Sequence, residues 1–179
     1  MGAVQVCSQA SLDLTSAKLN VILGGARVIS PRSGRNVGTM SATSVEDLFQ
    51  EIGRQAVAVA GDDLAGRLLV YAEVEDRVIS TNLLYKNRDG DVRLVLGPRP
   101  LDDLVYELWE RWKAESGYAE WRVLSYIVDM NGKEAKMTID LTYPDDVDVE
   151  EGVHDRRPRA VQKYFGDVKL VFDDPFAFD

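Results

Sequence analysis

The sequence predicts an α+β domain with a mainly antiparallel sheet built from hairpins and two main helices packed on one face. In two segments, residues 44–60 and 101–116, apolar side chains recur every three or four residues, as on one face of a helix. The segments between and after them alternate apolar and polar residues, and short turn sequences join them in pairs. Because hairpins pair neighbouring strands antiparallel, we expect an antiparallel sheet with helices on one face.

Residues 1–39 differ in character from the rest of the chain. They are rich in Gly and Ser, show little sustained periodicity and carry a net charge of +3, whereas the whole chain carries −9. The remaining residues therefore carry −12. We expect residues 1–39 to be a poorly ordered extension upstream of a natural start at Met40, or else a loosely ordered arm. Residues 40–179 have a length typical of one domain.

The first predicted helix spans residues 44–60. Thr43 lies just before it and Glu46 follows three residues later, which is the spacing of a capping box. Gly61 marks its expected end. The apolar positions are Val45, Leu48, Phe49, Ile52, Ala56 and Val59.

Three strands are predicted next, over residues 67–75, 78–87 and 92–96. The first two form a hairpin, and a strong Asp-Gly turn sequence precedes the third. The alternation in the first strand places Glu73 and Glu75 on its more solvent-exposed face. Its other face carries Leu68, Val70, Ala72 and Val74.

The second predicted helix spans residues 101–116, and Pro98 and Pro100 are expected to separate it from the third strand. Asp102 and Asp103 suit its first turn because negative side chains are stabilised at the positive end of the helix dipole. Its apolar stripe consists of Leu101, Leu104, Val105, Leu108, Trp109 and Trp112, so both tryptophans are expected in the core.

A second hairpin is predicted around Asn131-Gly132, between residues 120–130 and 133–143. In its second strand the apolar side chains lie on one face and the polar ones on the other, which predicts one buried and one wetter side of the sheet. An acidic connection, a short helix over residues 158–165 and a last strand over residues 167–172 complete the order.

The chain lacks the residues that most catalytic and metal sites need. Cys7 is the only cysteine, which excludes a disulfide within the chain and a cysteine-rich zinc site. His154 is the only histidine, and no nucleophile elbow or phosphate-binding glycine loop is present. The acidic balance argues against nucleic-acid binding, and no apolar run reaches the length of a membrane helix. We therefore expect no cofactor and no catalytic residue, and we expect the cytoplasm as the compartment.

The acidic connection, residues 142–157, has the alternating acids of a calcium-binding loop but fails as one. Glu151 stands where an EF-hand requires Gly, and Arg157 stands where it requires the bidentate Glu. We therefore predict no metal ligands, although a looser divalent site stays open. Its candidate residues are Asp145, Asp146, Asp148 and Glu150.

The order of short motifs resembles the YezG-like immunity family of bacterial toxin systems. A YAEV strand leads a hairpin that ends in Tyr, a helix with Leu-Trp at its centre follows, and a Trp-led strand, a Gly-Lys turn and a closing strand complete the pattern. The matching residues are Tyr71, Ala72, Glu73, Val74, Tyr85, Leu108, Trp109, Trp121, Gly132, Lys133, Asp140, Tyr143 and Asp145. The chain departs from the family at Glu134 and Ala135, where a Phe is common.

The resemblance implies an antitoxin: a cytoplasmic protein without catalytic activity that binds and blocks the basic C-terminal domain of a cognate toxin, often a nuclease. The strongly negative charge agrees with such a partner. The hypothetical toxin-binding residues are Asp145, Asp146, Asp148, Glu150, Glu151, Glu73, Glu75 and Trp121. Two other classes stay open, an adaptor with a non-toxin partner and a small enzyme with a carboxylate or divalent-metal site. The oligomeric state does not follow from the sequence.

Overall fold

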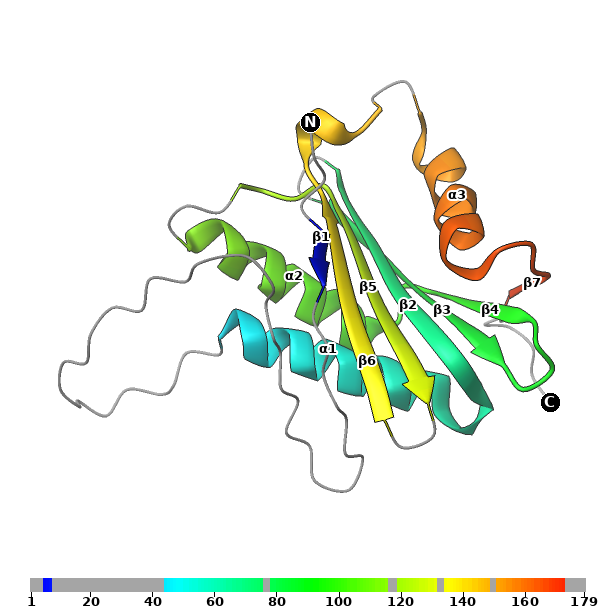
Figure 1. Cartoon of the computed structure of the whole chain (residues 1–179). Helices are drawn as coiled ribbons and strands as arrows, with labels where there is room; N and C mark the ends of the chain where they lie inside the picture. Colours follow the sequence, from blue (N-terminus) through cyan, green and yellow to red (C-terminus); the bar gives the residue numbers. More distant parts are fainter. Residues whose placement is uncertain are drawn as a thin grey trace, which may run out of the picture.

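The computed structural model describes residues 5–7, 44–75, 78–115, 119–131, 134–148 and 151–172. Its strands form one seven-stranded sheet in the order β1-β6-β5-β2-β3-β4-β7 (Figure 1). Every neighbouring pair is antiparallel except β4 and β7, which run parallel. The predicted α+β class and the mainly antiparallel sheet are confirmed. No helix in the described part is long and apolar enough to cross a membrane.

Helix α1 (Val45–Ala60) begins one residue later than the predicted cap implies. Ser44, not Thr43, is the N-cap residue, and Asp47 completes the capping box that was expected at Glu46. The Asp47 backbone N–H donates to the Ser44 hydroxyl at 3.0 Å, and the Ser44 N–H donates to the Asp47 carboxylate at 3.1 Å. The hydrogen bonds from Ser44 hold the pKa of Asp47 below its ordinary value. Both sequence pairs have the right spacing, so spacing alone did not decide between them.

The first strands follow the prediction closely. A single 3-10 turn, η1 (Gly61–Asp63), leads into β2 (Leu64–Glu75), which pairs with β3 (Val78–Asn87); β3 pairs in turn with β4 (Val92–Leu96). The β2–β3 register shifts between Leu64 and Leu68. Gly66 lies in this irregular stretch with a φ of +97°, a conformation that L-residues with side chains rarely adopt.

Helix α2 (Arg99–Ala114) begins two residues earlier than predicted. Pro98 caps it, and Pro100, expected as a breaker, lies within its first turn. Proline is tolerated there because the first backbone N–H groups of a helix have no intrahelical acceptor. The second hairpin is confirmed: β5 (Val123–Asn131) pairs with β6 (Glu134–Thr142) over its whole length.

The C-terminal part departs most from the prediction. A 3-10 turn, η2 (Pro144–Asp146), follows β6, and helix α3 (Val153–Phe165) begins five residues before Pro158, the predicted start. The last strand is short, β7 (Leu170–Phe172). Strand β1 (Gln5–Cys7) pairs with β6, although no element was expected within residues 1–39. The remainder of that segment lies outside the described residues, so the expected extension and the start at Met40 stay predictions.

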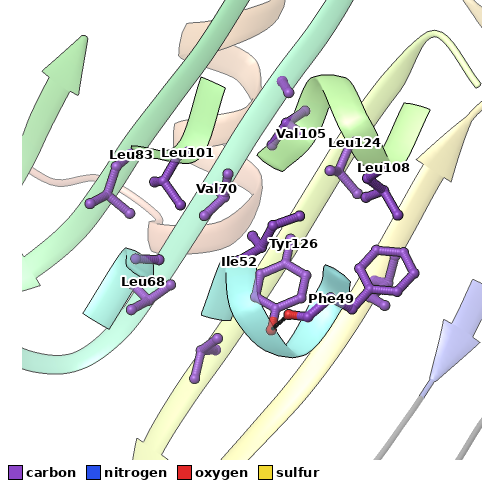
Figure 2. Close-up of a cluster of buried hydrophobic side chains, with 14 of the residues drawn as sticks. Phe49, Ile52, Leu68, Val70, Leu83, Leu101, Val105, Leu108, Leu124 and Tyr126 are labelled. Carbon is purple, nitrogen blue, oxygen red and sulfur yellow. Dashed lines mark hydrogen bonds between the residues drawn. The ribbon is translucent and has the colours of Figure 1, made fainter. Parts of the chain in front are cut away.

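The sheet has a core on each face. Helices α1 and α2 cover one face, as predicted, and α3 lies on the opposite face (Figure 1). In Figure 2 the side chains of α1, α2 and the sheet converge, and Tyr126 reaches the main chain of α1, where its hydroxyl donates to the Phe49 carbonyl at 2.9 Å. The second core includes Leu69, Tyr71, Leu84, Val92, Leu94, Val123, Ile127 and Val161. The prediction of one wetter side is therefore wrong wherever α3 covers the sheet.

Candidate functional site: the acidic loop and the hollows beside it

The acidic loop leaves the sheet at the end of β6 through a tight turn. Pro144 starts the 3-10 turn, and backbone hydrogen bonds close it from the Asp146 N–H to the Tyr143 carbonyl at 2.9 Å and from the Val147 N–H to the Pro144 carbonyl at 3.3 Å. Asp145 and Asp146 are exposed on this turn. The turn thus presents two adjacent carboxylates to solvent.

The rest of the loop is only partly available to a partner. Asp148 is exposed, whereas Glu150 lies outside the described residues. The Glu151 side chain is 11% exposed and forms an ion pair with Arg159 at 2.8 Å. Glu151 is therefore directed into the fold, contrary to its predicted place on the surface ridge.

Glu73, another predicted binding residue, is a buried structural residue with only 4% of its surface exposed. Arg156 of α3 donates to one of its oxygens from Nη2 at 3.0 Å and from Nε at 3.2 Å, and the Tyr71 hydroxyl donates to the other. Burial, followed by the hydrogen bond to Glu73, raises the pKa of Tyr71, so its phenol stays protonated. The hydrogen bond to Glu73 likewise raises the pKa of Arg156. The prediction for Glu73 is corrected because α3 covers that face.

Glu75 and Trp121 differ from each other in exposure. The Glu75 side chain is 55% exposed and pairs with Arg122 at 3.0 Å, so it remains at the surface. Trp121 is 1% exposed, so it is a core residue, and its prediction as a toxin-binding residue is corrected. Trp109 is also in the core, as predicted.

Two hollows lie beside the acidic loop. The larger, of about 540 Å³, lies between α2 and residues 119–122. The smaller, of about 370 Å³, lies between the end of β2 and the start of α3. Both are lined by Arg122 and Pro144, so they are neighbours and adjoin the turn that carries Asp145 and Asp146. The larger hollow is also lined by Val74, Tyr106, Trp109, Glu110, Lys113, Glu120 and Trp121.

The larger hollow is bordered by two tryptophans whose indole N–H groups have no acceptor among the described residues, Trp109 and Trp121. Leaving a buried donor without a partner costs roughly 1–3 kcal/mol. The neighbouring Trp112 avoids this cost, because its indole donates to the Ala119 carbonyl at 2.9 Å. Both indole nitrogens are themselves buried, so neither is open to the hollow that the two side chains line.

The outward face of α2 carries four exposed residues that were not among the predicted binding residues. Asp103, Tyr106, Glu107 and Glu110 are all exposed there. Their spacing, i, i+3, i+4 and i+7, is that of one helix face, so the pattern that located the apolar stripe could also have located this one. Within the described residues, no group of three or more His, Cys, Asp or Glu side chains has the geometry to hold a metal ion.

No protein-family model matches this chain, and no curated protein matches its sequence. The resemblance to the YezG-like family therefore remains an expectation that rests on the short motifs alone.

Proposed function

We propose that this chain is an immunity protein that binds and neutralises a cognate bacterial toxin domain through an acidic surface around Pro144. The observation that carries the proposal is the exposed position of Asp145 and Asp146 beside two hollows, in a chain whose residues 40–179 carry a net charge of −12. None of the ion pairs among the described residues uses either carboxylate.

A basic toxin domain is the partner that this charge favours. A nuclease binds phosphate with cationic side chains, and an acidic protein that occupies its cleft excludes the substrate. Complementary charge also raises the rate of encounter, by roughly 10–10³-fold. Speed matters to an immunity protein, which must bind the toxin before the toxin acts.

The first test is affinity capture from the native host with the chain tagged at its C-terminus, followed by mass spectrometry. We expect one basic, toxin-like domain to be recovered when the toxin is expressed. Expression of that domain in a heterologous bacterial host should arrest growth, and co-expression of this chain should restore it. Capture of no such domain, or failure to restore growth, would contradict the proposal.

The acidic loop itself is tested by Asp145→Asn, Asp146→Asn and Asp148→Asn together. We expect the triple variant to associate with the captured domain more slowly at low salt, and the dependence of the rate on ionic strength to flatten, because screening acts on exposed charges. Stopped-flow fluorescence measures both. Association at the unchanged rate in low salt would remove the loop from the interface.

A further inference from the structure

Helix α3 covers only part of the sheet face on which it lies. The second core reaches Leu84 on β3 and Leu94 on β4. Because side chains alternate between the two faces of a strand, Val78 lies on the same face as Leu84, and Leu96 lies on the same face as Leu94. Val78 is 68% exposed and Leu96 is 60% exposed. This face therefore carries large apolar side chains beyond the area that α3 covers.

Strand β7, at the edge of the sheet, adds a third exposed apolar side chain to this face (Figure 1). Phe172 pairs with Leu94, and paired residues point to the same face of a sheet. Phe172 is 61% exposed. In the described part of the chain, three of the four exposed large apolar side chains thus lie on this one face; the fourth, Tyr106, is on α2. We call Val78, Leu96 and Phe172 the open patch.

The chain leaves β7 in the direction of the open patch. Strands β7 and β4 are parallel with Phe172 opposite Leu94, so the same register continued would bring position 174 level with Leu96, the last residue of β4. Pro175 follows, and proline has no backbone N–H for a further ladder hydrogen bond. We therefore expect the chain to leave the ladder there.

Only one face of the sheet is open at that point. On the other face, α2 begins at Arg99, three residues after Leu96, and its Leu101 is part of the first core. On the α3 side, Leu96 pairs with Asn82 of the antiparallel strand β3, so Val78 lies four residues further in the direction in which β7 runs. A chain that continues from β7 on this side passes from Leu96 towards Val78.

The segment that follows Phe172 has the length and the side chains to cover the open patch. Residues 173–179 lie outside the described residues and have the sequence Asp-Asp-Pro-Phe-Ala-Phe-Asp. Phe176 and Phe178 are two residues apart, so both rings point to one side of an extended backbone. Leu96 and Val78 are about 14 Å apart by strand geometry. The four residues from position 174 to Phe178 span about 13 Å when extended.

We propose that residues 173–179 run across the α3 side of the sheet and cover the open patch, with Phe176 on Leu96 and Phe178 towards Val78. The segment is attached to Phe172 and is therefore present at a high effective concentration over the patch. A second copy of the chain lacks this advantage and carries the same net charge of −9, which opposes association. The inference is independent of the proposed function, because it concerns a contact within the chain.

The experiment is methyl NMR on the full chain, with ¹³C-labelled Leu and Val methyl groups and protonated Phe rings. Packed side chains approach within about 4.5 Å, which is close enough for nuclear Overhauser effects. We expect such effects from Phe rings to the Leu96 and Val78 methyl groups. Phe176→Ser with Phe178→Ser should abolish those at Val78, whereas Ala177→Ser, the matched control between the two rings, should leave them. Absence of the effects at Val78 in the natural chain, or their persistence in the double variant, would overturn the proposal.

A soluble gadolinium chelate measures the same contact as protection from solvent. We expect the paramagnetic relaxation of the Leu96 and Val78 methyl groups to be at least halved in the natural chain relative to the double Phe→Ser variant. The half-buried Leu104 of α2 is the internal reference and should relax equally in both proteins, which also checks that the variant is folded. Equal relaxation at Val78 in the two proteins would contradict the cover.

A mixed sample separates contact within the chain from contact between copies. Chains with ¹³C-labelled methyl groups are mixed with chains that carry protonated Phe rings and no ¹³C label. We expect no effect from Phe rings to the Val78 methyl groups in an isotope-filtered spectrum of this mixture. Effects between copies would overturn the proposal and assign the open patch to a second copy of the chain.

Discussion

The two faces of the sheet are covered by helices of different chemistry. Helices α1 and α2 bury a continuous apolar layer, whereas Val161 alone is buried among the described side chains of α3. Apart from Val161 and three partly buried residues at that core, α3 is held by three polar links. These join Arg156 to Glu73, Lys163 and Tyr164 to Asp140, and the Tyr164 carbonyl to Arg67, which also pairs with Asp129. Helices α1 and α2 are held mainly by hydrophobic burial, whereas α3 depends more on specific polar partners.

This difference predicts a difference in stability. Burial of apolar surface is non-directional and nearly independent of pH, whereas ion pairs respond to protonation and, where exposed, to salt. Segments with few buried apolar contacts open before the rest of a domain. We therefore expect α3 to detach from the sheet before α1 and α2 do.

The largest effect is expected from Arg156→Ala. It leaves the Glu73 carboxylate buried without its cation, and removal of one partner of a buried pair costs about 3–5 kcal/mol. The free energy of unfolding in urea measures the loss. Gln162→Ala is the matched control on the same helix: Gln162 is exposed, and such surface substitutions usually change the stability by less than about 0.5 kcal/mol. Equal losses would show that the Glu73 pair is not what holds α3.

An intermediate effect is expected on the other face from Gly53→Ala. An alanine normally stabilises a helix by about 1 kcal/mol over glycine. Here a Cβ at Gly53 would overlap the Tyr126 hydroxyl, and overpacking costs about 1–3 kcal/mol. We expect net destabilisation of the whole domain in thermal unfolding. Ala58→Gly, at an exposed position of the same helix, should show the ordinary propensity cost, and stabilisation by Gly53→Ala would disprove the tight packing.

The smallest effect is expected from acid. Burial alone raises the pKa of Asp140, but the hydrogen bonds from Tyr164 and Lys163, at 2.7 and 2.9 Å, outweigh it and hold the pKa below the ordinary value. A carboxylate with a lowered pKa stabilises the fold above its unfolded pKa, and this contribution is lost as the pH falls through the folded pKa. Hydrogen-exchange protection factors of α3 should fall below about pH 4 while those of α1 stay. Asp140→Asn should remove the difference between neutral and acid pH.

Local and long-range features of this fold differ in how far the sequence predicts them. The apolar stripes of α1 and α2 and the alternation in the strands are local patterns, so both helices and both hairpins were predicted to within a few residues. An ion pair between residues far apart in the chain, such as Glu73 and Arg156, produces no local pattern in the sequence. Glu73 was therefore predicted on a solvent-exposed face, although Arg156 of α3 covers it.

The candidate site was predicted only in part for a similar reason. Asp145 and Asp146 are adjacent acidic residues, so the sequence alone identifies them, and both are exposed in the structure. The hollow is built from α2, Trp121 and Pro144, which meet only through the tertiary fold. Pro158 misled the prediction because proline favours helix starts, yet α3 tolerates it in its second turn.

The parallel pairing of β7 with β4 means that α3 is tethered at both ends. The chain leaves the sheet from β6 near one edge and returns as β7 at the other. A helix whose two ends are fixed in this way keeps a high effective concentration over the surface that it covers, in the millimolar range for short flexible links. Each polar link can therefore break singly without loss of the helix, and α3 can open and return faster than a free helix could find the sheet.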